Sequence, residues 1–173
     1  MKRKSLLVWA VLILLVSLAM APGSAAARAI RVGFTGMEVP LGPPLEPGVW
    51  VVLRNGNVHV RGMVSQSQEY ASDPLMSGVI TVVMNANWGP DYAGPMWGTN
   101  ESVLGDSAGC PGGGLWKGTW TGTMNSDESY SYRGVGQGIS GCVEGLHYSL
   151  IAVNPGTGEA TTYTGEILDP HGE

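Results

Sequence analysis

The sequence predicts an all-β protein, a closed or nearly closed antiparallel up-and-down barrel of about eight strands with one disulfide. Three observations predict this fold. After Arg28, apolar and polar residues alternate and helical periodicity is almost absent. Glycine is abundant, with 27 in the chain, and turn-forming residues separate short strand-like segments. The only two cysteines, Cys110 and Cys142, lie equidistant from Ser126 in a predicted hairpin turn.

The N-terminus has the pattern of a cleaved signal peptide, residues 1–27. Basic residues 2–4 precede an apolar run of 15 residues from Leu6 to Met20, and small residues follow at 25–27. An uncleaved membrane anchor is the alternative, but the run is shorter than the roughly 20 residues that span a bilayer. We therefore expect an exported protein (secreted, periplasmic or at the cell surface), with a single β-barrel domain over 28–173 and no integral membrane segment after cleavage.

The charge of the mature chain disfavours anionic partners. Without residues 1–27, six Lys and Arg remain against 14 Asp and Glu, a net charge near −8. A chain of this sign with no basic cluster repels the phosphate backbone of nucleic acids and the surface of anionic lipids. We expect no nucleic-acid partner, and the oligomeric state is left open.

The clearest hairpin surrounds Asn55-Gly56, the preferred pair for a two-residue type I′ turn. Its arms are 50–53 and 58–61, and the second arm continues to residue 68. This turn would pair Leu53 with Val58 and place Trp50 on the face opposite to both. Further strands are predicted at 30–37, 77–87, 94–104, 146–153 and 161–168, with a proline-rich loop at 40–47.

A second hairpin, of arms 115–124 and 130–139, lies between the cysteines. Folded about Ser126, it would set Trp120 against Tyr132 and Trp116 against Gly136, so that one face carries rings and glycines. The other face would be polar, toward water or a wet lumen. Cys110 and Cys142 would then form a disulfide at the base of this hairpin. A reactive thiol is the alternative, but no Cys-x-x-Cys motif is present.

Motifs for catalysis or metal binding are weak. Residues 136–141 match G-x-G-x-x-G, but a strand follows where a dinucleotide site needs a helix. His59 and His147 stand without partners at metal-ligand spacing, so we expect no metal and no cofactor. No G-x-S-x-G motif occurs, and the catalytic residues, if there are any, are unknown.

The aromatic residues offer the best candidate site. Five tryptophans follow Arg28, at 50, 88, 97, 116 and 120, against a single phenylalanine. Such rings either fill the core of a glycine-rich barrel or line a site for a carbohydrate or apolar ligand. The candidate ligand-binding residues are Trp116, Trp120, Tyr130 and Tyr132.

Three runs, 116–123, 132–138 and 163–167, resemble the repeated glycine and aromatic strands of allene-oxide-cyclase-like β-barrels. They are most similar to the bacterial members, which are largely of unknown function. The resemblance covers roughly the C-terminal half and implies a small closed barrel with a lumen. No catalytic position of the plant enzymes matches a residue here.

These observations leave three hypotheses for function. The first is an exported binding or structural module that holds a small apolar or amphipathic ligand. The second is an isomerase or cyclase that acts on an apolar substrate in the same lumen, and the third is an adhesion-type β-sandwich. An open lumen would favour the first two, and a polar group inside it with a shifted pKa would favour an enzyme.

Overall fold

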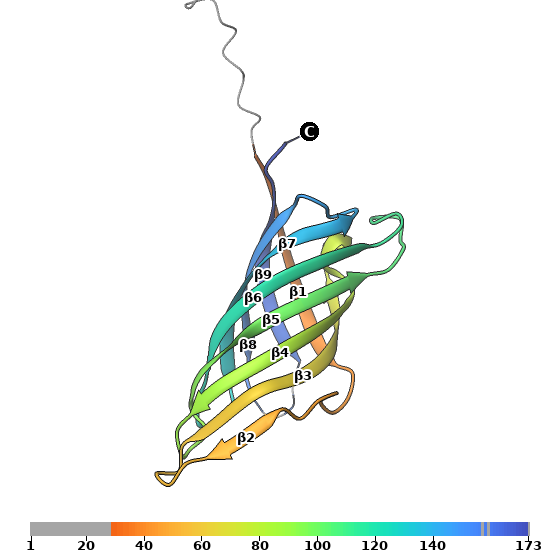
Figure 1. Ribbon diagram of the computed structural model, residues 1–173. Helices are drawn as coiled ribbons and strands as arrows, with labels where there is room; N and C mark the ends of the chain where they lie inside the picture. Colours follow the sequence, from red (N-terminus) through yellow and green to blue (C-terminus); the bar gives the residue numbers. More distant parts are fainter. Residues whose placement is uncertain (1–28, 157, 159, 173) are drawn as a thin grey trace, which may run out of the picture.

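The computed structural model describes residues 29–156, 158 and 160–172, so the predicted signal peptide lies outside the described residues. Nine antiparallel strands and one short 3₁₀ helix make up the fold (Figure 1). The elements are β1 (Ile30–Pro40), β2 (Val49–Val52), β3 (Val58–Ala71), η1 (Pro74–Met76), β4 (Val79–Trp88), β5 (Gly94–Leu104), β6 (Gly114–Met124), β7 (Tyr130–Gly141), β8 (His147–Asn154) and β9 (Thr161–Asp169).

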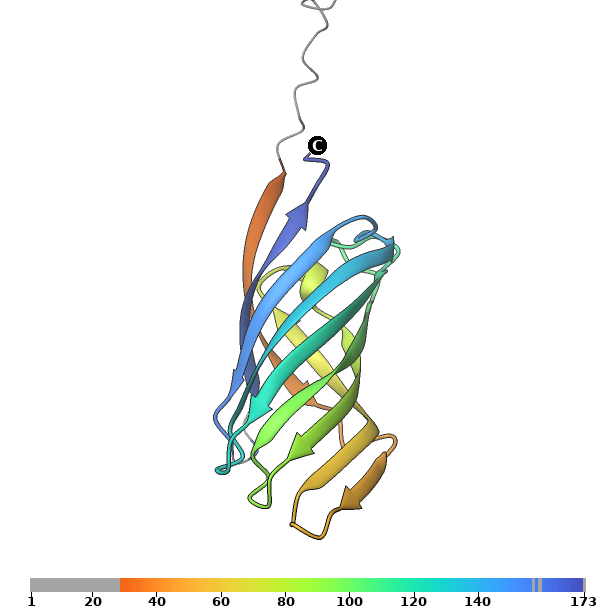
Figure 2. The same cartoon turned by 60° about the vertical axis from the view of Figure 1, so that its left-hand side comes forward.

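The nine strands form one sheet that closes on itself. Each strand from β3 to β9 pairs with its neighbour in the chain, β9 pairs with β1, and β1 pairs with β3 to close a ring of eight strands. β2 pairs with β3 alone and lies outside the ring (Figure 2). The predicted up-and-down barrel is confirmed, and the fold is a barrel rather than a two-sheet sandwich.

The β2–β3 turn differs from the prediction by one residue. Gly56 donates its N–H to the Leu53 carbonyl at 2.9 Å, and Leu53 pairs with Asn57, so the loop has three residues instead of two. Of its residues only Gly56 has a positive φ, of 85°, as in a type I turn closed by a glycine bulge. The register therefore pairs Trp50 with Val60, which is buried, and the predicted register was wrong.

The hairpin of β6 and β7 also turns through three residues, centred on Asp127 instead of Ser126, with Glu128 at a φ of 67°. Trp120 therefore pairs with Gly134, so the predicted pairing with Tyr132 was wrong by two residues. A shift of two preserves the side of the sheet on which each side chain lies. The side chains of the predicted aromatic and glycine face therefore all point into the barrel, and those of the polar face point to water.

Glycines on the inner face make room for a large ring. A Cβ on Gly118 or Gly136 would collide with the side chain of Tyr148, which lies over both residues. The Tyr148 ring in turn packs edge-on against Trp116, with centroids 5.3 Å apart. The glycine spacing in this part of the sheet thus allows a Trp–Tyr pair to pack inside the barrel.

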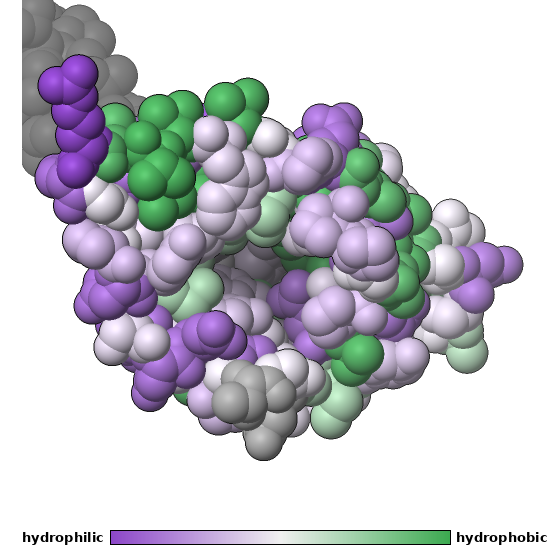
Figure 3. All heavy atoms as spheres, turned by 90° about the horizontal axis from the view of Figure 1, so that it is seen from below, coloured by the Kyte–Doolittle hydropathy of each residue, from purple (hydrophilic) through white to green (hydrophobic). Residues whose placement is uncertain are grey.

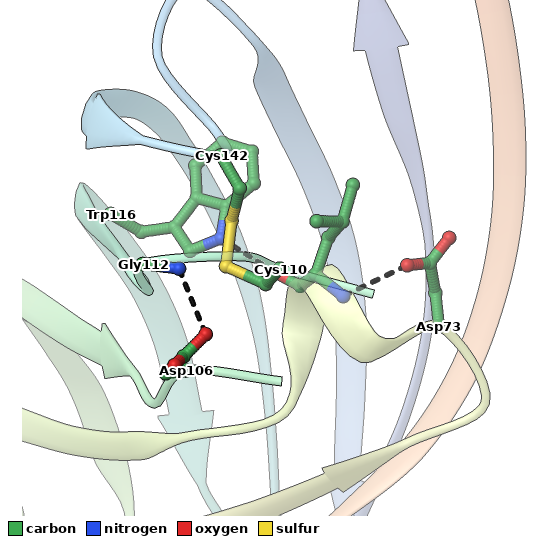
Figure 4. Close-up of a disulfide and its surroundings, with 7 residues drawn as sticks. Asp73, Asp106, Cys110, Gly112, Trp116 and Cys142 are labelled. Atoms are coloured by element: carbon green, nitrogen blue, oxygen red, sulfur yellow. Dashed lines mark hydrogen bonds between the residues drawn. A yellow bond between two sulfur atoms is a disulfide. The ribbon is translucent and has the colours of Figure 1, made fainter. Parts of the chain in front are cut away.

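The disulfide fastens the end of the barrel at which β1 begins and β9 ends (Figure 1), and its surroundings are shown in Figure 4. Cys110, in the β5–β6 loop, is bonded to Cys142, which follows β7, so the predicted bridge at the hairpin base is confirmed. η1 lies beside it, and the Trp116 indole N–H donates to the Leu75 carbonyl at 2.7 Å. Asp73 caps η1 by accepting from the Leu75 N–H at 2.9 Å. This arrangement fills one end of the barrel, which we call the closed end.

In the described part of the chain, no helix is long and apolar enough to cross a membrane.

Candidate functional site

The interior of the barrel holds a cavity of about 320 Å³. It opens at the end opposite the disulfide, where the β4–β5 and β6–β7 turns lie, and Figure 3 shows the hollow from that side. Trp50 of β2 and Trp88 of β4 stand at this opening, with ring centroids 5.7 Å apart. We call this the open end. The volume is at the lower limit of the range typical of small-molecule sites.

Most of the cavity wall is apolar and adaptable. Five of the eight methionines in the chain line it, together with Ile80, Val82 and Leu150. The five are Met63, Met76, Met84, Met96 and Met124. Unbranched thioether side chains adjust to ligands of irregular shape better than branched ones. The wall can therefore accommodate an apolar chain or ring without a rigid fit.

A set of hydrogen-bonding side chains interrupts this apolar wall, and we call it the polar cluster. Its members are Glu38 of β1, Glu69 of β3, Asn100 and Ser102 of β5, Tyr132 of β7 and Tyr148 of β8. Three hydrogen bonds join them in pairs. Ser102 donates to Glu69 at 2.6 Å, Tyr132 donates to Glu38 at 2.9 Å, and the Asn100 amide donates to the Tyr148 hydroxyl at 2.8 Å.

Glu69 is the most perturbed acid of the cluster. Its side chain is 3% exposed, and burial raises its pKa to about 8, against the opposing effect of the Ser102 hydrogen bond. The nearby carboxyl of Glu38 adds a smaller upward effect. At neutral pH the Glu69 carboxyl is therefore largely protonated and can donate as well as accept a hydrogen bond.

The tyrosines of the cavity are all held in the neutral form. Burial raises the pKa of Tyr148 to about 12, and burial together with Glu38 raises that of Tyr132 well above its ordinary value. Tyr130 shows a smaller rise from the same causes, and its hydroxyl lies 2.7 Å from that of Thr161. These hydroxyls serve as neutral donors and acceptors and not as bases near neutral pH.

The structure places all four candidate ligand-binding residues on the cavity wall. Trp116, at its closed end, is fully buried, whereas Trp120 packs against Tyr132 with centroids 5.6 Å apart. Tyr130 stacks on Tyr132 nearer the opening. Their role in binding stays a prediction. Of the other tryptophans, Trp97 lies on the outer side of the barrel, where Arg61 sits over its ring at 5.2 Å.

Sequence reasoning missed every member of the polar cluster except Tyr132. The side of the sheet on which Glu69 lies depends on a bulge in β3. Val60 pairs with Ala86 and Met63 with Met84, so β3 has one residue more than β4 between these two pairs. After this bulge the inward positions are odd-numbered, and Glu69 points inward. Glu38 carried a usable signal, because strict alternation from Phe34 through Gly36 places it on the buried face of β1.

No group of three or more metal-ligating side chains occurs among the described residues. His59 and His147, which the sequence left without partners, lie on β3 and β8 and do not line the cavity. Comparisons with protein-family models, with curated proteins and with solved structures found no match to this chain.

Proposed function

We propose that this protein is a binding barrel that holds a small amphipathic ligand in its lumen. One observation carries the proposal: an open cavity of about 320 Å³ has methionine and tryptophan walls and a hydrogen-bonded polar cluster inside. A domain that needed only a stable core would fill this space, because protein interiors are close-packed.

The two kinds of wall match the two parts of such a ligand. The methionines of the strands, with Val82, suit an apolar chain or ring toward the opening, whereas Met76 of η1 lies at the closed end. Ser102 and Glu69 offer hydrogen bonds deeper in the lumen, in surroundings where an unpaired polar group would be costly to bury. A ligand with one polar group and one apolar body would contact both.

We also propose that the barrel acts outside the cytoplasm. The signal-peptide pattern of residues 1–27 supports export. The disulfide between Cys110 and Cys142 supports it independently, since such bridges persist mainly in oxidising compartments.

The binding proposal is tested with a neutral fluorescent probe, N-phenylnaphthylamine. Saturable binding with increased fluorescence is expected for the wild type. Ser65 lines the cavity, so Ser65→Trp should fill it and weaken binding at least about tenfold. Gln66→Trp, one residue along β3 and on the outer side, is the matched control and should bind normally. Equal binding by both variants would place the probe elsewhere and refute the proposal.

Native mass spectrometry of protein purified from its own host gives a second readout. A small molecule that accompanies the wild type and is lost in Ser65→Trp would identify the natural ligand class. The Gln66→Trp protein should retain that molecule.

A second candidate function is an isomerase or cyclase in the same lumen. The observation that favours it is Glu69, a buried carboxyl whose pKa of about 8 suits proton transfer near neutral pH. Ser102 holds this carboxyl at the cavity wall. The protein would be incubated with a small-molecule extract of host cells, followed by chromatography and mass spectrometry. A new isomer formed by the wild type and not by Glu69→Gln supports catalysis, and an unchanged extract opposes it.

A further inference from the structure

The cavity wall carries carboxyl groups but no cationic side chain. Glu38 and Glu69 line it, whereas no Lys, Arg or His of the described chain does. The cations lie on the outside: Lys117 pairs with Glu101 at 2.8 Å and Arg31 with Glu166 at 2.8 Å, all of them well exposed. Within the described chain, the carboxyls of the lumen therefore have no cationic side chain beside them.

The two carboxyls are direct neighbours. Glu38 on β1 and Glu69 on β3 are paired residues at the seam where these strands close the ring, and both point inward. Like charges directly opposite each other destabilise a sheet, and more so away from water. Two inward acids at this position make sense if something positive lies between them, either a proton or the charged group of a ligand.

Aromatic rings surround the same place. Tyr132 donates to Glu38 and stacks beside Tyr130, and the Trp120 ring lies against Tyr132. Ring faces attract ammonium groups, and the attraction is strongest where water is excluded. Carboxyls and rings together form a setting that favours a cation with apolar substituents.

We infer that the polar end of the ligand is a cation, a protonated amine or a quaternary ammonium group, seated between Glu38, Glu69 and the rings of Trp120 and Tyr132. The apolar part then extends along the methionine wall toward the open end. This inference rests on the proposed binding function of the lumen. It excludes fatty acids and other carboxylates as ligands, because they would bring a further carboxyl group to a cavity that is lined by two carboxyls and, among the described residues, by no cationic side chain.

The titration of Glu69 should make the affinity for a cation depend on pH. The titratable groups around this carboxyl are Glu38 of β1, Tyr132 of β7, Tyr148 of β8 and Tyr163 of β9. The three tyrosines stay neutral at working pH, so Glu38 is the neighbouring acid that matters. With the lumen empty, the pKa of Glu69 is about 8, and a bound cation must displace its proton to solvent. Affinity for a cation of fixed charge should therefore rise with pH until about pH 8 and then level off.

The test uses three probes that share one octyl chain: octyltrimethylammonium, octanol and octanoate. Titration calorimetry near pH 7 should show the cation binding at least about tenfold more tightly than octanol, with octanoate weakest. Repeating the cation titration in buffers of different ionisation enthalpy should reveal proton release. Octanol or octanoate binding as tightly as the cation overturns this inference and leaves the binding barrel standing. Binding of none of the three probes counts against the binding barrel itself.

Matched variants locate the charge. Glu69→Gln and Glu38→Gln should each weaken the cation about tenfold while octanol is unaffected. Glu101→Gln removes an exposed carboxylate on the outer side of β5 and should change neither probe. Loss of affinity for both probes in Glu69→Gln would indicate a merely structural role, and so would an unchanged affinity for the cation. Either result overturns the inference.

Discussion

The two ends of this barrel are built from the same residue types and differ in what those residues enclose. At the closed end, Trp116 and Tyr148 pack edge to face under η1, and the disulfide joins the loops outside them. At the open end, Trp50 and Trp88 stand around the mouth of the cavity. Rings therefore pack in the core at one end, and at the other they surround the opening of the proposed binding site. One tryptophan-rich β-barrel can thus combine core packing at one end with the proposed ligand binding at the other.

The largest expected effect is at the closed end. Trp116→Ala should destabilise the protein by about 3–5 kcal/mol, because it removes a fully buried ring and leaves the Leu75 carbonyl without its donor. Urea unfolding followed by far-UV circular dichroism measures the loss. A cost below about 1 kcal/mol would show that the closed end is not the stabilising part of the barrel.

Breaking the disulfide should cost somewhat less. The bridge closes a loop with a sequence separation of 32, which corresponds to about 3–4 kcal/mol in the chain-entropy model. Cys142→Ser should lower the melting temperature while the far-UV spectrum keeps its β signature. The wild type melted with reductant should match the variant. If neither treatment changes the melting temperature, the two cysteines are not bonded in solution.

Stability should depend on pH through Glu69. Its folded pKa, about 8, lies above its ordinary value of 4.5, so its contribution is complete below about pH 4.5 and is lost as the pH rises to about 8. We expect a decline of a few kcal/mol over that window, with about 5 kcal/mol as the upper limit set by the shift.

The measurement for this prediction compares two unfolding curves at each pH. Glu69→Gln does not titrate, so the difference between wild type and variant isolates the contribution of this carboxyl. A difference in unfolding free energy between wild type and variant that stays constant with pH would mean that Glu69 is not held protonated in the folded barrel. The polar cluster would then resemble the solvated outer surface more than a buried site.

The smallest expected effect is at the open end. Trp50 is 47% exposed and lies on the strand outside the ring, so Trp50→Ala should cost less than about 1 kcal/mol. It should nevertheless speed release of N-phenylnaphthylamine, measured by stopped-flow dilution, because it widens the mouth. A stability loss equal to that of Trp116→Ala would erase the distinction between the two ends.

The sequence predicted the strands and the disulfide well, because alternation and turn residues are local signals. It predicted the inner face of β6 and β7 correctly although the register was off by two, since an even shift keeps each side chain on its side. The single-residue error at the β2–β3 turn had the opposite result and placed Trp50 on the wrong face.

The candidate site was predictable only in part. Its rings stood out by composition, but its acids did not. Glu69 faces inward only because the bulge between Val60 and Met63 adds one residue and so reverses which positions of β3 point inward. No local residue pattern shows where such an extra residue lies. The neighbouring Glu38 belongs to a strand that meets β3 through ring closure, a long-range pairing that alternation alone does not specify.

Closure through β1 also has a consequence for how the chain folds. Ile30 pairs with Asp169, so β1 cannot pair with both of its neighbours, β3 and β9, until the last strand of the chain is in place. Hairpins from β3 to β8 can form locally and quickly, whereas the final joint brings together distant parts of the chain and is expected to be slow. Until that joint forms, β1 and β9 expose unpaired strand edges that can pair with another chain. The pairing of β1 with β9 is thus the step before which an unfinished barrel is most prone to aggregate.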